Sequence, residues 1–190
     1  MCPSVVSPNL MGWRDQRYGE PKPPSPLMST NDQEQAMSQL SEVLLVDDNM
    51  ADVYLASEAL RMTSESCNVS NVGDGEEALA YLRHEGRFAG SVCPNVVILD
   101  LRLPKKSGEA VLAELRSDPN LRKIPVVIFS TSRSNQDIVR SYELGANCYL
   151  SKPGSLPEFI STVQLIGTFF GCSKSVSEGE QWNDRKRAYC

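Results

Sequence analysis

The sequence predicts an α/β fold with one doubly wound parallel sheet of five strands and helices on both of its faces. Between residues 42 and 170, apolar runs of strand length alternate five times with segments of helical character, which is the pattern of βα units. The run Val96–Leu99 contains no polar residue, as expected for a strand covered on both faces. An apolar fraction of 41% in 190 residues suffices for one well-filled core, whereas a second full domain would not fit comfortably.

The first two βα units lie between residues 42 and 86. The strand Val43–Val46 precedes a helix with Asp52 in its first turn, where the helix dipole favours a negative charge. A weaker strand at 67–72 ends at the turn Gly73-Asp74-Gly75, and its helix stops near Gly86. The two helices carry their apolar positions as follows: Val53, Ala56 and Leu60 in the first, and Ala78, Leu79 and Leu82 in the second.

The remaining three units follow the same order. Their strands are Val96–Leu99, Val126–Phe129 and Cys148–Leu150. The third helix is closed by Asp118-Pro119, the fourth ends before Gly145, and the fifth begins at a capping box, 155–158. Their apolar positions are Val111, Leu112 and Leu115, then Ile138, Val139 and Tyr142, and finally Phe159, Val163, Ile166 and Phe170.

The segments outside this domain have a different composition. Residues 1–41 are rich in Pro, Ser, Asn and Gln, so we expect a disordered N-terminal extension. Residues 171–190 form a polar C-terminal tail that is too short for an independent output domain. The predicted organisation is therefore an extension, one α/β domain over 42–170, and a tail.

Charge and cysteine usage narrow the function classes. The net charge of −5 and the isoelectric point near 5.0 argue against nucleic-acid binding, and the basic run 185–187 is read as solvated tail. No apolar stretch in the sequence predicts a secretory signal or a membrane span. The cysteines show no metal-binding spacing, and Cys67, Cys93 and Cys148 lie in or beside apolar runs, as reduced cysteines do. We therefore expect a cytoplasmic protein that binds neither nucleic acid nor a membrane.

Acidic residues follow two of the predicted strands directly. Asp47-Asp48 ends the first strand and Asp100 ends the third. Because right-handed crossovers bring the carboxyl ends of all five strands to one edge, these carboxylates should converge. Converging carboxylates repel one another unless a hard cation such as Mg²⁺ neutralises them or one of them takes part in covalent chemistry. Ser130 and Lys152, at the ends of the fourth and fifth strands, add a hydroxyl and an amine to the same edge.

These motifs, in this order, resemble the receiver domains of two-component response regulators. The matching segments are Leu44–Asn49, Ile98–Pro104, Ile128–Ser130 and Tyr149–Pro153. The resemblance covers about 42–170 and implies a flavodoxin-like sheet with strand order 2-1-3-4-5. Residues 130–149 and the long segment between Glu85 and Pro94 look most like the stand-alone regulators that partner bacterial phytochromes.

The resemblance implies a role for each residue of the edge. Asp100 would be the phosphoacceptor that forms an aspartyl-phosphate. Asp48 and Asp100 would bind Mg²⁺ directly, Asp47 would act through water, and the backbone carbonyl of Arg102 would complete the protein ligands. Ser130 and Lys152 would each hold a phosphoryl oxygen, and the Lys152–Pro153 bond resembles one that is cis in the family.

The resemblance also implies a switch and partners. Ser130 and Tyr149 would be the switch pair, with Tyr149 turning inward and changing the surface of the fourth helix, fifth strand and fifth helix for a downstream protein. The donor would be a sensor histidine kinase, phytochrome-like in the closest subfamily. The chain would be a phosphoacceptor that assists its own phosphorylation and dephosphorylation rather than an enzyme, with Arg102 and Ser132 at positions that tune hydrolysis. A homodimer is expected, with an interface altered where Phe169-Phe170 gives way to Gly171.

Two other functions stay open at this point. A haloacid-dehalogenase-like Mg²⁺-dependent phosphohydrolase also uses an aspartate nucleophile on a parallel sheet, but its Asp-x-Asp motif is not matched by Asp47–Asn49 followed by Met50. A flavodoxin-like binding module that is never phosphorylated is the other alternative. Singly, the site residues also have simpler readings: Asp47–Asn49 as a helix entry, Lys152 as a surface lysine, and Tyr149 as a half-buried strand tyrosine.

Overall fold

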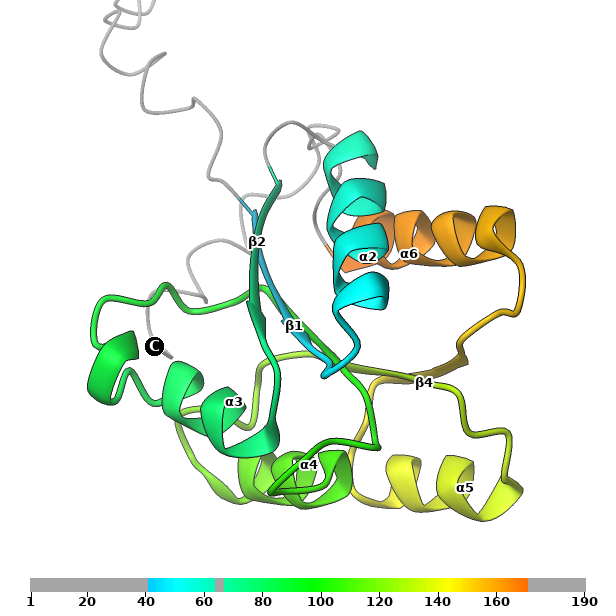
Figure 1. Ribbon diagram of the computed structural model, residues 1–190. Helices are drawn as coiled ribbons and strands as arrows, with labels where there is room; N and C mark the ends of the chain where they lie inside the picture. The colour runs from blue at the N-terminus through cyan, green and yellow to red at the C-terminus, as the bar shows by residue number, and fades with distance from the viewer. Residues whose placement is uncertain (1–40, 64–66, 171–190) are drawn as a thin grey trace, which may run out of the picture. The chain divides into compact units, whose positions relative to one another are not determined.

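The computed structural model describes residues 41–63 and 67–170, which form a five-stranded, fully parallel sheet with the order β2-β1-β3-β4-β5 (Figure 1). The predicted fold class and strand order are therefore confirmed. The predicted extension and the polar tail lie outside the described residues, apart from Ser41, which begins the first strand. The elements are β1 (Ser41–Val46), α2 (Met50–Thr63), β2 (Cys67–Val72), α3 (Gly75–Leu82), a 3₁₀ turn η1 (Gly86–Phe88), β3 (Val96–Leu99), α4 (Gly108–Ser117), β4 (Val126–Ser130), α5 (Asn135–Glu143), β5 (Cys148–Ser151) and α6 (Leu156–Phe170).

Side chains that alternate along the central strands build two separate cores, one on each face of the sheet. Val43, Leu45 and Ile98 point to the face covered by α2 and α6. Leu44, Val46 and their neighbours point to the face covered by α3 and α4, with α5 farther along (Figure 1). Because both faces are covered, the central strands are apolar throughout, as predicted for 96–99.

The helices bury the positions that their periodicity predicted, with one exception. Helices α2, α3, α4 and α6 turn their apolar stripes to the sheet. Helix α5 does so only in part, because Ile138 packs against the core but Val139 and Tyr142 are 57% and 50% exposed. Ser141 is its only fully buried residue. The hydroxyl of Tyr142 instead accepts a hydrogen bond of 3.2 Å from the backbone N–H of Tyr149 on the edge strand β5.

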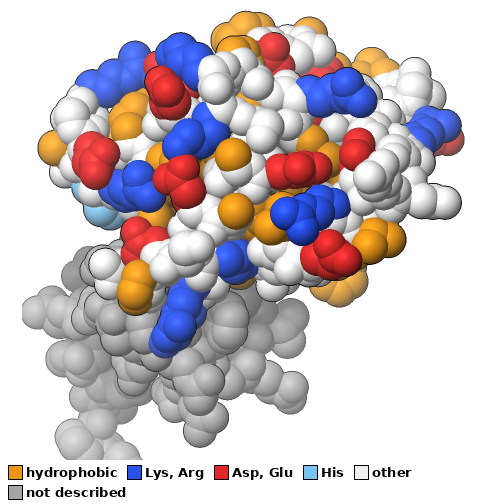
Figure 2. All heavy atoms as spheres, turned by 90° about the horizontal axis from the view of Figure 1, so that it is seen from below, with side chains coloured by type: hydrophobic (Ala, Val, Ile, Leu, Met, Phe, Trp, Pro, Cys, Tyr) orange, Lys and Arg blue, Asp and Glu red, His pale blue; other side chains and the backbone are white. Residues whose placement is uncertain are grey.

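The surface over α3 and α4 carries charges of both signs. Figure 2, which views the molecule from below, shows Lys and Arg side chains interspersed with Asp and Glu on that face. Glu114 on α4, for example, pairs with Arg83 after α3 and with Lys106 in the loop before α4. These partly exposed pairs neutralise one another locally, and surface pairs of this kind add little to stability.

Two predictions about covalent structure require correction. Cys67 and Cys148 form no disulfide, as predicted for reduced cysteines, but Cys93 is disulfide-bonded, which corrects the prediction of a reduced thiol there. All described peptide bonds are trans, so the cis bond expected between Lys152 and Pro153 is absent. No helix within 41–63 and 67–170 has the length and apolar character needed to span a membrane.

A buried carboxylate lies on β1. Glu42 is 3% exposed and accepts hydrogen bonds from Asn68 Nδ2 at 2.6 Å, Ser70 Oγ at 2.6 Å and Tyr81 Oη at 3.0 Å. Parallel pairing places Asn68 beside Glu42, with Ser70 two residues further along β2. Burial raises the pKa of the Tyr81 hydroxyl, and the charge of Glu42 raises it further, so that the phenol remains a donor. These contacts join β1, β2 and α3.

We expect Glu42→Gln to lower the free energy of unfolding by about 1–3 kcal/mol, because one of the two acceptor oxygens becomes an NH2 group that faces a donor. Urea denaturation followed by far-UV circular dichroism measures this loss. The exposed Glu58→Gln on α2 is the matched control and should change stability little. Combining Glu42→Gln with Tyr81→Phe should give less than the sum of the single losses, whereas strict additivity would contradict a coupling of the two side chains through their hydrogen bond.

Candidate functional site

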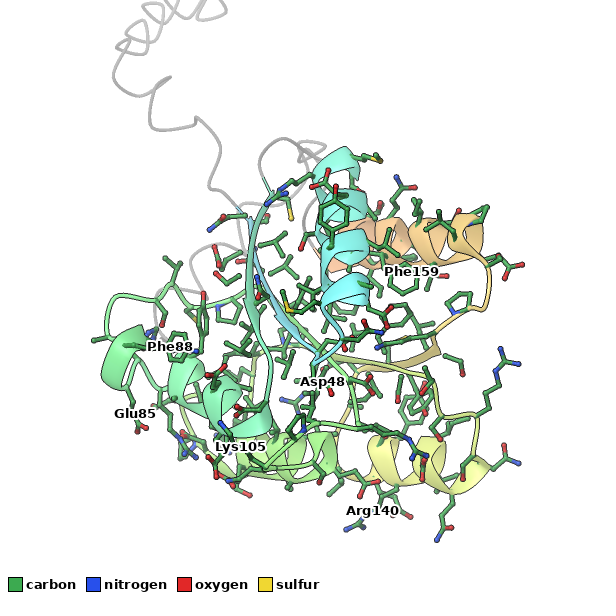
Figure 3. All side chains as sticks on the ribbon, viewed as in Figure 1. Asp48, Glu85, Phe88, Lys105, Arg140 and Phe159 are labelled. Carbon is green, nitrogen blue, oxygen red and sulfur yellow. The ribbon has the colours of Figure 1, made fainter. Side chains whose placement is uncertain are left out.

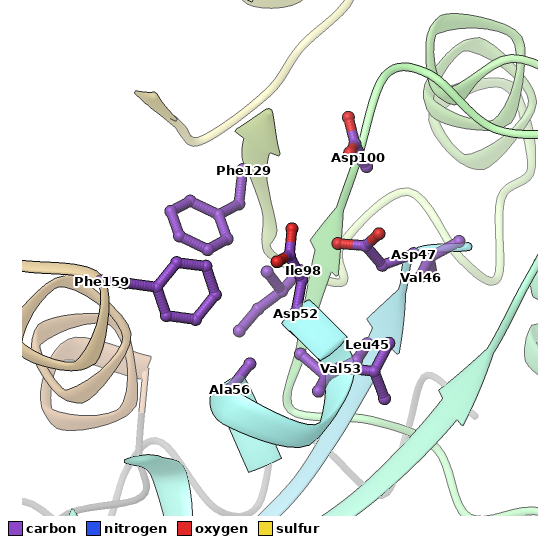
Figure 4. Close-up of a pocket in the computed structure, with 10 residues that line it drawn as sticks. All are labelled: Leu45, Val46, Asp47, Asp52, Val53, Ala56, Ile98, Asp100, Phe129 and Phe159. Carbon is purple, nitrogen blue, oxygen red and sulfur yellow. The ribbon is translucent and has the colours of Figure 1, made fainter. Parts of the chain in front are cut away.

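The carboxyl edge of the sheet brings together the side chains that the sequence predicted to meet there. Asp47 follows β1, Asp100 follows β3, Ser130 ends β4 and Lys152 follows β5. Figure 4 shows the carboxylates of Asp47 and Asp100 at this edge, with the aromatic rings of β4 and α6 to one side. Their convergence follows from the topology, because every strand of a parallel sheet joined by such crossovers ends at the same edge.

The ammonium group of Lys152 is the centre of the cluster. Its Nζ lies 2.6 Å from Asp47 Oδ2, 2.8 Å from Asp100 Oδ2 and 2.9 Å from Asp52 Oδ2. The side chain of Lys152 is only 5% exposed, so a lysine with three N–H donors meets three acceptors almost out of solvent. The reading of Lys152 as a solvated surface lysine is therefore wrong.

This geometry shifts the pKa values of two groups. Burial alone would lower the pKa of the Lys152 ammonium, but its hydrogen bonds to Asp100, Asp47 and Asp52 outweigh burial and raise that pKa far above its usual value. Burial raises the pKa of Asp47, and the hydrogen bond from Lys152 offsets only part of this effect. The lysine is thus charged at any physiological pH and neutralises part of the carboxylate repulsion.

Asp100 is held on both of its oxygens. Oδ2 accepts from Lys152, while Oδ1 accepts from Ser130 Oγ at 2.7 Å and from the backbone N–H of Arg102 at 3.2 Å. Asp100 is 6% exposed and Ser130 is fully buried. The carboxylate is therefore fixed in orientation, with a hydroxyl and an ammonium on either side of it.

Close packing fixes the loop that follows Asp100. Gly108 begins α4 so near this loop that an added Cβ would lie 2.1 Å from the carbonyl oxygen of Asp100 and 2.8 Å from Cα of Leu101. The N–H of Gly108 also donates to the carbonyl of Leu101 at 2.9 Å. Only glycine allows this approach, and it sets the backbone position of Asp100 relative to the neighbouring strands.

One residue of the cluster was missed and another lies outside it. Asp48 is exposed at the end of β1 (Figure 3), whereas Asp52 in the first turn of α2 reaches Lys152. The sequence analysis read Asp52 only as a favourable charge for the helix dipole. Its position in the turn that directly follows the acidic strand end was the available signal, because that turn lies at the same edge of the sheet.

The donor set suits a hard divalent cation, since the oxygens of Asp47 and Asp100 are the ligands that Mg²⁺ prefers. In the described residues, however, no three Asp, Glu, His or Cys side chains are grouped to hold a metal ion. The Lys152 ammonium lies among the carboxylates instead. The residues fit a cation, provided that Lys152 gives up part of its contact with Asp47 and Asp100.

The trans bond before Pro153 is compatible with this placement of the lysine. The backbone N–H of Lys152 donates to the carbonyl of Ser130 at 2.8 Å, which continues the β4–β5 ladder to the edge. From that point the extended side chain reaches all three carboxylates. A cis bond is therefore not needed to direct the amine into the site.

A second set of hydrogen bonds leads from the site to α5. Tyr149 is 9% exposed and its hydroxyl donates to the carbonyl of Ser132 at 2.9 Å. Ser132 is itself buried, and its hydroxyl donates to Asp137 in the first turn of α5. Tyr149 therefore lies in the inward position, on the same side of the sheet edge as Ser130.

The fold and the site together define a receiver domain, and comparison with known families agrees. Residues 43–164 match the family described as the response regulator receiver domain, and the chain belongs to this family. It is 41% identical over 128 residues to the response regulator Rcp1 of Synechocystis sp., covering 67% of this chain and 87% of that protein. A probable methanogenesis regulatory protein of Methanothrix harundinacea, FilR2, is 40% identical over 129 residues, covering 67% and 82%.

Solved structures show the same relationship. The phosphorylated cyanobacterial phytochrome response regulator RcpA superposes with a TM-score of 0.68 at 43% identity, covering 73% of this chain and 99% of that one. The Mn²⁺-bound form of Rcp1 gives 0.67 at 38% identity with the same coverage. The family match does not favour the phosphohydrolase or the unphosphorylated binding module.

We expect Lys152→Met to lower the free energy of unfolding by about 3 kcal/mol in metal-free buffer, because three carboxylates lose their shared cation. Millimolar Mg²⁺ should restore more stability to this variant than it adds to the wild type, since the metal can replace the missing charge. Urea denaturation with and without Mg²⁺ measures both effects.

The matched control is Lys105→Met, which removes the exposed lysine of an ion pair with the buried Asp74, away from the site, and should respond to Mg²⁺ as the wild type does. A Lys152→Met variant with wild-type stability in metal-free buffer would show that the ammonium does not neutralise the cluster.

Proposed function

We propose that Asp100 accepts a phosphoryl group from a sensor histidine kinase and that the chain signals through a protein whose binding depends on this phosphorylation. The observation that carries the proposal is the environment of Asp100, which is buried, fixed on both oxygens, and flanked by the ammonium of Lys152 and the hydroxyl of Ser130. The family membership supports the same chemistry.

The transfer step is a displacement at phosphorus. An Asp100 oxygen forms a new P–O bond, the P–N bond to the kinase histidine breaks, and the histidine nitrogen leaves with the electron pair and later takes up a proton. Lys152 holds one phosphoryl oxygen as a point charge, and Ser130 donates its hydroxyl to another. Both groups already contact Asp100 before transfer, so little reorganisation is required.

We further propose that Mg²⁺ is the resident cation, held by Asp48 and Asp100 directly, by Asp47 through water, and by the backbone carbonyl of Arg102. When bound, it supplies positive charge that neutralises the carboxylates and the phosphoryl oxygens. The Mn²⁺-bound structure of Rcp1 supports a divalent site in a relative. Lys152 then shifts its contacts from the acidic pair toward the phosphoryl oxygen.

The output surface in this proposal is that of α5, β5 and α6. Ser130 and Tyr149 form the switch, and the bonds from Tyr149 to Ser132 and from Ser132 to Asp137 connect it with α5. Val139 and Tyr142 leave apolar surface exposed on that helix, which a downstream protein can cover. Ser132 and Arg102 lie beside the acceptor, where they would tune hydrolysis of the aspartyl-phosphate.

The similarity to Rcp1 and RcpA supports a phytochrome-like histidine kinase as the partner and a stand-alone regulator. We propose a cytoplasmic location for the chain. We also propose a homodimer. The described chain places Leu165 and Phe169, 52% and 77% exposed, one turn apart on α6, where a second copy can cover them. Residues 1–41 and 171–190 are proposed as an extension and a tail outside the receiver domain.

Incubation with acetyl phosphate and Mg²⁺ should add one acid-stable, hydroxylamine-labile phosphate to the wild type, detected by intact-mass spectrometry. Asp100→Asn should take up none, because an amide cannot act as the nucleophile. The control Asp118→Asn removes a carboxylate at the end of α4, away from the site, and should be labelled at the wild-type rate. Equal labelling of Asp100→Asn would refute the assignment.

A further inference from the structure

Asp52 is the member of the site for which the proposed chemistry has no role. It is the third residue of α2, and its Oδ2 lies 2.9 Å from Lys152 Nζ. Its side chain is 21% exposed, more than those of Asp47 and Asp100 at 12% and 7%. Asp52 thus lies at the more exposed side of the cluster, and its carboxylate contacts the lysine. Figure 4 shows this carboxylate beside those of Asp47 and Asp100.

The three carboxylates differ in their other partners. Asp47 also accepts from the backbone N–H of Asn49 at 3.0 Å through Oδ1, and Asp100 accepts from Ser130 and Arg102. Asp47 and Asp100 are therefore positioned independently of the lysine. Asp52 is oriented by its bond to Lys152, and α2 holds its backbone.

We propose that Asp52 is a positioning residue that retains the Lys152 ammonium at the site while Asp47 and Asp100 are engaged by the divalent cation and the phosphoryl group. This inference rests on the proposed function. An ammonium with three donors would lose two acceptors at that moment, and a phosphoryl oxygen would replace one of them. Asp52 keeps its bond throughout, because it is neither a proposed metal ligand nor the acceptor.

The surroundings of the lysine offer few other acceptors. On the side of α2 and α6 the carboxylates border a cavity of about 10 Å³, which Phe129 and Phe159 also line (Figure 4). A cavity of this size holds about one water molecule. The ring of Phe129 lies 6.0 Å from Lys152 Nζ and offers no hydrogen-bond acceptor of comparable strength. Because the Lys152 side chain is only 5% exposed, the carboxylate of Asp52 is the charged acceptor that remains for it.

Asp52→Asn and Asp52→Glu test this role, with Glu58→Gln on the exposed side of α2 as the matched control. The readout is the side-chain ¹H–¹⁵N signal of the Lys152 ammonium, recorded without metal and then with Mg²⁺ and beryllofluoride, a phosphoryl mimic. In the wild type and in Glu58→Gln the signal should persist in both states. In Asp52→Asn it should broaden or exchange away once beryllofluoride binds, and Asp52→Glu should restore it.

The rate of labelling by acetyl phosphate gives a second measure, which should fall about threefold or more in Asp52→Asn, as expected for the loss of one charged hydrogen bond shared with other partners. An Asp52→Asn variant with the wild-type lysine signal and labelling rate would overturn the proposal. Loss of the wild-type signal on binding beryllofluoride would also overturn it, without any variant.

Different experimental outcomes would refute the proposed function and the role of Asp52. Wild-type protein that neither binds beryllofluoride nor takes up phosphate on Asp100 would refute the proposed function, and the role of Asp52 with it. If the wild type is phosphorylated normally and Asp52→Asn has the wild-type lysine signal and labelling rate, the role of Asp52 alone is refuted.

Discussion

The site depends on one interaction, the contact of a single buried ammonium with three carboxylates from different parts of the chain. Asp47 comes from the end of β1, Asp52 from α2 and Asp100 from the end of β3, and Lys152 reaches them from β5. Without the lysine, three negative charges would face one another in a region with little solvent. The bonds therefore join the first, third and fifth strands of the sheet. The same contacts thus fix the geometry of the edge and balance the charge of the site.

The same balance explains how the site can be stable and still reactive. The lysine neutralises the acidic groups in the resting protein, and the groups that hold Asp100 on one oxygen, Ser130 and the N–H of Arg102, do not involve the lysine. In the proposed reaction, a cation or a phosphoryl group can therefore replace the lysine's contacts one at a time, while Asp100 stays in place. The approach of α4 to the backbone of Asp100 depends on glycine at 108, because a Cβ there would meet the carbonyl oxygen of Asp100.

Hydrophobic periodicity and the topology of parallel sheets predicted the α/β fold and the meeting of Asp47, Asp100, Ser130 and Lys152. The strand order was predicted from the resemblance to receiver domains. Neither predicted which of the neighbouring acids turns inward. That choice depends on the turn at 47–49. The carboxylate of Asp47 accepts a hydrogen bond from the N–H of Asn49, and the side-chain oxygen of Asn49 accepts one from the N–H of Ala51. The first turn of α2 then places the carboxylate of Asp52 beside the lysine. The hydrogen bonds of Glu42 could not be predicted either, because they depend on the register of β1 against β2. The exposure of Val139 and Tyr142 on α5 could not be predicted from their apolar character alone.

The bond between Tyr142 and the N–H of Tyr149 bears on how the protein avoids unwanted association. Strand β5 is the last strand of an open sheet, and unpaired amides at such an edge are a template on which another chain can add a strand. The Tyr142 hydroxyl occupies one of these amides from outside the sheet. At this position another strand can pair with the amide of Tyr149 only if the Tyr142 hydroxyl moves away, so association at this edge competes with a contact of the folded chain.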